Sequence, residues 1–93
     1  MVRYKVKPER IEEHEALIRA VFGALGNDKP DGLRYAAYKA ADGVSFVHVA
    51  FVAGAVNPLN ELAEFRAFTA EIKDRCDEAP VTTEYAEVAA YGL

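Results

Sequence analysis

The chain of 93 residues contains no tryptophan and a single cysteine, Cys76. One cysteine excludes an intramolecular disulfide and is typical of a reducing compartment, so we expect a cytoplasmic protein. The first seven residues hold no apolar segment of a secretory signal, and the longest apolar stretch, residues 43–56, is interrupted by Ser45 and His48. That stretch is also shorter than the roughly 20 residues that a membrane-spanning helix needs. We therefore expect no membrane partner.

An excess of basic charge is also absent. The formal net charge is -4, the pI is about 5.1, and both signs are interspersed along the chain. These values argue against nucleic acid as a partner. The sequence has no phosphate-binding glycine loop and no Cys-x-x-Cys or His-Glu-x-x-His motif. These missing motifs leave a nucleotide cofactor and a structural zinc without support. Because the two histidines and the glutamates share no short spacing, we expect no metal.

The first half of the chain predicts strand, helix and hairpin within one domain covering residues 1–93. Residues 2–7 alternate apolar and cationic side chains, as in a half-buried strand. A helical period begins behind Pro8 and ends at Gly26-Asn27. Leu33–Ala40 and Val44–Val52 then flank Asp42-Gly43, which predicts two strands joined by a two-residue turn.

The second half predicts one more helix and one more strand. Asn57 as N-cap and Pro58 begin a helix that runs to about Arg75, with Cys76 as a small core residue on its apolar side. Ala79-Pro80 stop it, and Thr82–Tyr91 alternates as a last strand. The order β-α-β-β-α-β predicts an α+β, ferredoxin-like fold, with two helices on one face of a four-stranded antiparallel sheet.

The third predicted strand carries apolar side chains on both of its faces. Val44, Phe46, Ala50 and Val52 lie on one face, and Val47, Val49 and Phe51 lie on the other. Two helices cover only one face of a sheet, so the second face needs a partner. We therefore expect a homodimer formed through the face that the helices leave open. The alternative is that this face stays in contact with water.

Four short segments, spread over nearly the whole chain, share a pattern with a known family. They are Val6-Lys7-Pro8-Glu9-Arg10 before an acidic helix, Gly32-Leu33-Arg34-Tyr35, Asp42-Gly43 before Phe46-Val47-His48-Val49, and the helix pattern Leu59, Leu62, Phe65, Phe68. Together they resemble the antibiotic biosynthesis monooxygenase family of the dimeric α+β barrel superfamily. The resemblance implies a homodimer with a pocket between each sheet and its helices. It also implies cofactor-independent oxidation of aromatic, polyketide-like substrates or quinols, so we expect no cofactor.

Two departures from relatives of this fold bear on the chemistry. The chain lacks the tryptophan that several oxygenases and haem-degrading members carry on a strand beside the pocket, and Phe51 or Val52 stands near that position. It also has Glu61-Leu62-Ala63 where haem-degrading relatives carry a helix histidine. The resemblance therefore does not favour haem degradation, and no matched residue supports an oxygenase.

His14 is the first candidate for the site. At about 100° per residue it lies in the middle of the apolar arc that Leu17 and Val21 share, so its side chain must point at the sheet. One role is that of a buried neutral imidazole held by a hydrogen bond. The other is acid–base chemistry in a pocket, which suits the pKa of an imidazole.

His48 and Tyr35 form a second candidate pair. A two-residue turn pairs Ala37 with His48 and Tyr35 with Ala50, which places His48 and Tyr35 on one face as diagonal neighbours. An imidazole and a phenol can exchange protons with an enolisable or phenolic substrate. The alternative for His48 is a polar network or the dimer face.

Arg34, Phe22 and Phe65 complete the predicted set as substrate-binding residues. Arg34 lies on the opposite face from Tyr35, where it binds an anionic group or, the role we favour, pairs with a carboxylate across the dimer. We expect a small-molecule pocket protein, a cofactor-independent monooxygenase-like enzyme acting on a small aromatic or enolisable compound. In that hypothesis His14 or His48 is the base and Tyr35 orients the substrate. The alternatives are a non-catalytic ligand-binding or stress-associated homodimer and a structural interaction module.

Overall fold

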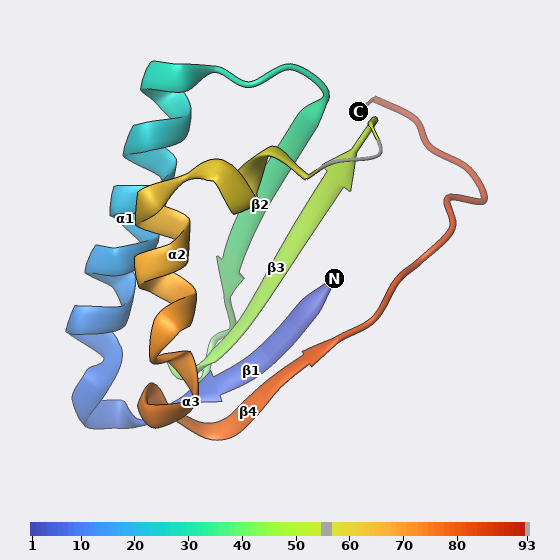
Figure 1. Cartoon of the computed structure of the whole chain (residues 1–93). Coiled ribbons are helices and arrows are strands. Elements are labelled where there is room, and N and C mark those ends of the chain that lie inside the picture. Colours follow the sequence, from blue (N-terminus) through green and yellow to red (C-terminus); the bar gives the residue numbers. More distant parts are fainter. Residues whose placement is uncertain (55–56, 93) are drawn as a thin grey trace.

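The computed structural model describes residues 1–54 and 57–92 and contains one antiparallel sheet (Figure 1). The sheet has the order β2-β3-β1-β4, and its strands are β1 (Val2–Val6), β2 (Leu33–Lys39), β3 (Ser45–Val52) and β4 (Cys76–Thr82). The helices are η1 (Pro8–Arg10), α1 (Ile11–Asp28), η2 (Pro58–Glu61), α2 (Ala63–Ala70) and α3 (Ile72–Arg75). Figure 1 shows α1 and α2 on the same face of the sheet. The predicted α+β, ferredoxin-like fold is confirmed.

The predicted helices are observed with different ends. α1 continues through Gly26-Asn27 to Asp28, where Lys29 in the left-handed region (φ 45°) closes it by donating its N–H to Leu25 O at 2.8 Å. Pro30 disfavours a further helical residue at Lys29, which explains why the helix ends there. The predicted end at Gly26-Asn27 is therefore wrong by one to two residues.

The second predicted helix is divided into three pieces. Asn57 caps η2 as predicted, since its side chain accepts the Leu59 N–H at 3.0 Å, and Pro58 is the first residue. Leu62 has an extended backbone and is buried at the junction of η2 and α2. Glu71 has a non-helical backbone conformation (φ -127°, ψ 27°) and separates α2 from α3. Leu62 is still in the core despite the interruption, as its place in the apolar pattern of this segment indicates.

The last predicted strand is in the wrong place. β4 covers Cys76–Thr82 rather than Thr82–Tyr91, so Cys76 begins a strand and does not lie on a helix. Pro80 lies inside β4, which an edge strand tolerates because one side of its backbone has no ladder partner. The segment 83–92 forms no strand and passes on the side of the sheet opposite the helices (Figure 1).

The hairpin register is the predicted one, with Ala37 opposite His48 and Tyr35 opposite Ala50. The connection is longer than a two-residue turn, because the last bond between the strands joins Ala40 N to Ser45 O at 2.8 Å. The Asp42 carboxylate organises residues 41–44 by accepting bonds from Val44 N, Ser45 N and the Ser45 hydroxyl. The Ser45 hydroxyl and these N–H groups lower the pKa of Asp42 to about 2. The predicted two-residue turn is wrong, but the pairing it implies is preserved.

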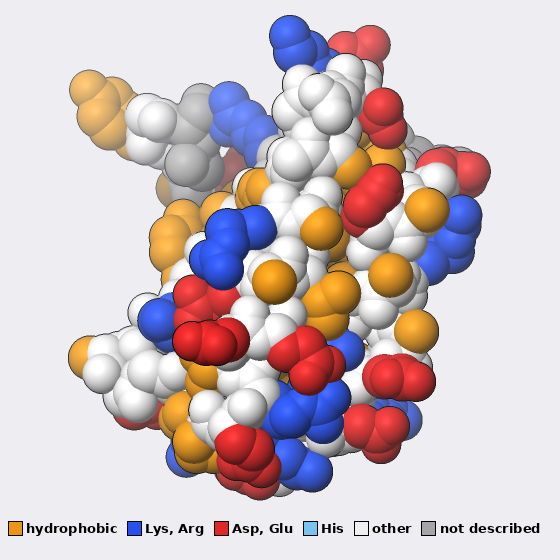
Figure 2. Space-filling view, turned by 90° about the vertical axis from the view of Figure 1, so that its left-hand side faces the viewer, with side chains coloured by type: hydrophobic (Ala, Val, Ile, Leu, Met, Phe, Trp, Pro, Cys, Tyr) orange, Lys and Arg blue, Asp and Glu red, His pale blue; other side chains and the backbone are white. Residues whose placement is uncertain are grey.

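The core lies between the helices and the sheet. Its buried apolar members are Tyr4, Val6, Val21, Phe46, Leu59, Leu62, Phe68 and Cys76. Figure 2 shows the outer surface of the helical side, where acidic and basic side chains are interspersed and no histidine is visible. Among the described residues, no helix has the length and apolar character needed to span a membrane.

The face of the sheet away from the helices is open, and the side chains that β3 contributes to it from Val47 to Phe51 are apolar, whereas β1 and β2 add Arg3, Lys5 and Arg34. Val47 and Val49 of β3 are half-buried there, and the Phe51 side chain is 44% exposed, whereas Phe46 on the helix side is 3% exposed. Tyr38 and Val81 are more than half exposed, and in the 83–92 segment so are Tyr85, Val88 and Tyr91. The prediction that β3 is apolar on both faces is confirmed.

Candidate functional site

A chain of hydrogen bonds crosses the core from α3 to β2. Arg75 Nε lies 3.1 Å from His14 Nδ1, and His14 Nε2 lies 2.6 Å from Tyr4 Oη. Tyr4 Oη lies 2.6 Å from His48 Nε2, and His48 Nδ1 lies 2.5 Å from Tyr35 Oη. We call Arg75, His14, Tyr4, His48 and Tyr35 the hydrogen-bonded chain. All are buried except Tyr35, which is half-buried.

Strand pairing brings together the three members of the hydrogen-bonded chain that lie on the sheet. Val2 pairs with His48 and Tyr4 pairs with Phe46, so Tyr4 and His48 are diagonal neighbours on the helix-covered face. Tyr35 is the diagonal neighbour of His48 on the other side, because it pairs with Ala50. Diagonal neighbours on one face lie within reach of aromatic side chains. The sheet thus lines up Tyr4, His48 and Tyr35 across three strands.

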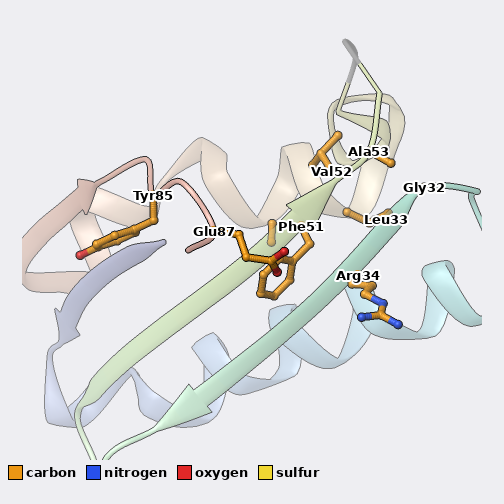
Figure 3. Close-up of a pocket in the computed structure, with 9 residues that line it drawn as sticks. Gly32, Leu33, Arg34, Phe51, Val52, Ala53, Tyr85 and Glu87 are labelled. Atoms are coloured by element: carbon orange, nitrogen blue, oxygen red, sulfur yellow. The ribbon is translucent and has the colours of Figure 1, made fainter. Parts of the chain in front are cut away.

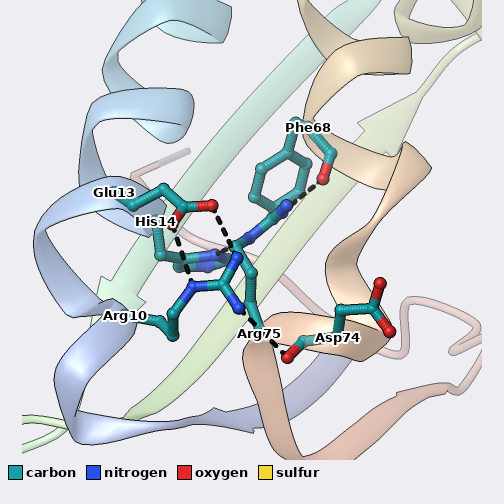
Figure 4. A network of polar contacts seen from close by, with 6 residues as sticks. All are labelled: Arg10, Glu13, His14, Phe68, Asp74 and Arg75. Atoms are coloured by element: carbon teal, nitrogen blue, oxygen red, sulfur yellow. Dashed lines mark hydrogen bonds and ion pairs between the residues drawn. The ribbon is translucent and has the colours of Figure 1, made fainter.

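The helices supply the other end of the hydrogen-bonded chain. The His14 side chain is 0% exposed and points from α1 onto the sheet, so the predicted orientation is confirmed. Its ring packs edge-on against Phe46, with 4.9 Å between ring centroids, and lies 5.2 Å from the Phe68 ring. Arg75 reaches inward from α3 to His14 and to the Phe68 carbonyl (Figure 4).

Burial keeps the imidazoles and phenols of this chain neutral. Burial, together with the Arg75 charge, lowers the pKa of His14 to about 4, and burial lowers the pKa of His48 to about 4. Burial also raises the pKa of Tyr35 to about 12 and raises the pKa of Tyr4. At pH 7 both imidazoles are therefore unprotonated and both hydroxyls keep their hydrogen.

A cavity of about 270 Å³ adjoins this chain between the sheet and α2. Its walls include Tyr4, Tyr35, His48, Phe65 and Phe68, and most of its other lining residues are apolar. The cavity lies between the sheet and its helices, which is where the family resemblance implies a pocket. His14 does not line it and is linked to it only through Tyr4.

The structure brings three of the predicted site residues to this cavity: Tyr35, His48 and Phe65. Phe22 does not line it. Its ring stacks on Tyr35 with 5.0 Å between centroids and 5° between planes, so Phe22 supports Tyr35 from the side. Phe22 borders a separate hollow of about 310 Å³ that includes Leu25.

Arg34 is separated from the other predicted site residues. Its side chain is exposed on the open face of the sheet, beside Phe51 and Glu87 (Figure 3). The hollow there has a volume of about 560 Å³ and is lined by the ends of β2 and β3 and by the 83–92 segment. One small ligand cannot contact both Arg34 and His48 because the sheet lies between them.

Sequence reasoning missed two members of the hydrogen-bonded chain. Tyr4 had a usable signal, because it shares the apolar side of the first strand with Val2 and Val6. Arg75 had none, because it follows Lys73 and Asp74 in a charged stretch that is typical of an exposed helix end.

No family model matches the chain, and no curated protein or solved structure matches it either. Within residues 1–54 and 57–92, no three histidine, cysteine, aspartate or glutamate side chains gather where they could hold a metal ion. The fold and site therefore define an α+β, ferredoxin-like protein with a small, mostly apolar cavity and a polar pair, Tyr35 and His48, on its wall.

Proposed function

We propose that the protein binds a small, largely apolar compound that carries a hydroxyl or carbonyl oxygen. The observation that carries this proposal is the pair Tyr35 and His48 on the wall of an otherwise mostly apolar cavity of about 270 Å³. Ligand sites combine an apolar lining with a few placed polar groups, and sites for drug-sized ligands span about 300–1,000 Å³. The smaller volume here suits a compound of one or two rings, packed against Phe65 and Phe68.

Within this proposal, the enzymatic hypothesis is cofactor-independent oxidation of a phenolic or enolisable compound, as the family resemblance implies. In such a reaction a phenol and dioxygen give a quinone and water, and the substrate supplies all the electrons. His48 and Tyr35 are the predicted catalytic residues that line the cavity, so they would contact the substrate. The lowered pKa of His48 favours a binding and orienting role over that of a strong base.

Non-catalytic binding of the same class of compound is the second candidate function. The observation that favours it is that both ring nitrogens of His48 are already hydrogen-bonded, to Tyr4 and to Tyr35, and burial lowers the pKa of His48 to about 4. Oxygen uptake in the presence of a bound naphthol separates the two candidates. Uptake with formation of a quinone supports the enzyme, and stable binding without uptake supports the carrier or sensor.

The Tyr35 hydroxyl is expected to contribute directly to ligand affinity. For Tyr35→Phe, we expect 1-naphthol to bind about 5- to 10-fold more weakly, because one hydrogen bond is worth about 1–1.5 kcal/mol. Isothermal titration calorimetry measures the change. The matched control is Tyr91→Phe, since the Tyr91 side chain is fully exposed and lies neither on the cavity wall nor in the interface proposed below. Equal affinity of wild type and Tyr35→Phe would contradict the assigned contact, and no affinity for naphthols, quinones or polyketide fragments would contradict the proposed function.

We further propose that the protein is a homodimer formed through the open face of the sheet. Val49 and Phe51 of β3 support this interface, as do the exposed side chains of Tyr38, Val81 and Tyr85. Apolar surface of this kind is a typical protein–protein interface. The mixed charges on the outer surface of the helices make that side less suitable (Figure 2).

Val49→Asp is expected to dissociate the dimer or to unfold it. The substitution places a carboxylate in a surface that the partner would cover, where burial removes the water that stabilises its charge. Sedimentation velocity at micromolar concentration should then change from a species of twice 10.2 kDa to one of 10.2 kDa. Ala20→Asp introduces the same charge on the exposed surface of α1 and should leave the dimer intact. A wild-type protein that sediments only as a monomer would exclude the interface.

A further inference from the structure

Arg75 is a buried cation without an ion pair. Its side chain is 2% exposed, and no carboxylate lies within 4.0 Å of it in the part of the chain that the structure describes. Its contacts are His14 Nδ1, the Phe68 carbonyl and the face of the Phe68 ring, 5.6 Å from the guanidinium carbon. Glu13 lies nearby but is paired with Arg10 at 2.8 Å (Figure 4). Burying an unpaired charge is costly, so this placement calls for an explanation.

Arg75 determines which way the hydrogen bonds run. A guanidinium has only donors, so His14 Nδ1 must accept from Arg75 Nε, and the neutral imidazole carries its hydrogen on Nε2. His14 Nε2 then donates to the Tyr4 oxygen, and the Tyr4 hydroxyl donates to His48 Nε2. His48 consequently carries its hydrogen on Nδ1 and donates it to the Tyr35 oxygen. In this order every donor up to Tyr35 has an acceptor.

The opposite order fails at Arg75. If Tyr35 donated to His48, then His48 would donate to Tyr4 and Tyr4 would donate to His14 Nε2. His14 would then carry its hydrogen on Nδ1, where two donors would face each other across the 3.1 Å that separates it from Arg75 Nε. Buried donors without acceptors are strongly disfavoured, so the outward order is the one that the geometry allows.

We propose that Arg75 orients the hydrogen-bonded chain so that the Tyr35 hydroxyl donates into the cavity. The site therefore selects a ligand with an anionic oxygen, that is, a phenolate or an enolate. This inference rests on the proposed function and names the ligand class of the same cavity. Arg75 does not line the cavity, so it is a positioning residue. A cation at the far end polarises successive hydrogen bonds in one direction and strengthens the last donor.

The charged and titratable groups around the hydrogen-bonded chain are consistent with donation that runs from Arg75 toward Tyr35. Glu13 and Glu15 of α1 act on His14, but Glu13 is paired with Arg10, and Glu15 lies 3.0 Å from Lys39. Cys76 of β4 acts on Tyr4, and burial keeps its thiol protonated by raising its pKa. Among the described residues, Arg75 is thus the charged member of the hydrogen-bonded chain, and it acts on the other members through its bond to His14.

The test uses 4-nitrophenol, whose phenolate and phenol forms differ in visible absorbance, and 4-nitroanisole, which has a similar shape but cannot ionise. With saturating wild-type protein, we expect the pKa of bound 4-nitrophenol to fall by about one unit, which corresponds to about tenfold tighter binding of the phenolate. Arg75→Met should remove this preference while 4-nitroanisole binds within about twofold of wild type. Arg75→Lys, which keeps the charge, should retain part of the preference.

Tyr4→Phe provides the second test, because it interrupts the chain without touching Arg75 and keeps the ring volume. It should remove the phenolate preference as Arg75→Met does, and circular dichroism confirms that each variant is folded. If Arg75→Met folds and keeps the phenolate preference of the wild type, the inference is overturned. If Arg75→Met does not fold, Tyr4→Phe decides, and an unchanged phenolate preference in that variant overturns the inference. Equal binding of phenol and phenolate by the wild type overturns the inference and leaves the proposed function standing. If neither compound binds the wild type, the proposed function fails and this inference fails with it.

Discussion

The free energy of unfolding is expected to fall as the pH is lowered from about 6.5 to about 4, because His14 and His48 are buried as neutral imidazoles. In the folded protein both have pKa values lowered to about 4. In the unfolded chain an imidazole titrates near 6.5, so within this window the unfolded state binds more protons than the folded state. Stability therefore rises with pH and is lost on acidification. Each imidazole contributes on the order of 2–3 kcal/mol.

The structural reason for this acid sensitivity lies in the hydrogen-bonded chain. A protonated His14 would present Nδ1–H to the Arg75 donor and would place a second buried positive charge beside the first. A protonated His48 would present donors to both tyrosine oxygens, and Tyr4 would lose its acceptor. Each protonation therefore breaks a bond as well as charging the core.

Urea denaturation, followed by circular dichroism at fixed protein concentration between pH 7.5 and pH 5, measures this effect. The chain has no tryptophan, so backbone ellipticity is the suitable signal. Two carboxylates, Glu13 and Asp42, also have lowered pKa values and therefore stabilise the folded state. Their contribution is lost mainly below about pH 4, where the carboxylates of the unfolded chain become protonated, so it does not affect the measured range. The variant His48→Gln should show roughly half the wild-type loss between pH 7 and pH 5. Flat wild-type stability across that range, or histidine NMR signals that titrate near 6.5, would contradict the prediction.

The positions of the two histidines could be predicted because each depends on local geometry alone. The phase of α1 is fixed by its apolar residues, and this phase places His14 against the sheet. The contact of His48 with Tyr35 follows from the hairpin register. In a hairpin the two residue numbers of every pair add up to the same sum, as they do for Ala37 with His48 and for Tyr35 with Ala50. A four-residue connection centred on the same point preserves that sum, which is why the incorrect turn length did not disturb the contact.

Two features could not be predicted because they depend on long-range partners. β4 begins at Cys76 since β1 offers it an edge, and the bond from Lys7 N to Arg75 O at 2.8 Å holds the chain where the strand starts. In sequence, Ala79-Pro80 indicates an interruption, and the alternation of Thr82–Tyr91 is the stronger strand pattern. Thr82 ends β4 opposite Val2, and the rest of that alternation, residues 83–91, has no strand partner within residues 1–54 and 57–92.

The hydrogen-bond partners of His14 could not be predicted from the sequence either. Arg75 and His14 are 61 residues apart, and no periodic pattern links an arginine at a helix end to the core. Sequence reasoning could require that a buried His14 have a hydrogen-bond partner, and the Tyr4 hydroxyl fulfils that requirement at 2.6 Å. The second partner of His14 is the Arg75 guanidinium, and its position depends on how α3 leads into β4.

His14→Ala is expected to lower the free energy of unfolding by about 2–4 kcal/mol, because it removes a packed ring and two hydrogen bonds. The imidazole is 0% exposed and packs against Phe46 and Phe68, so its removal leaves a hole that these rings cannot fill without moving. It also leaves Arg75 Nε without its acceptor and ends the donation to Tyr4. Urea denaturation at pH 7.5 measures the loss, and Glu12→Ala, an exposed position of α1, should change stability by less than about 0.5 kcal/mol. A loss below about 1 kcal/mol would mean that the ring is not a packed core residue, and a direct role in the pocket would then be the better interpretation.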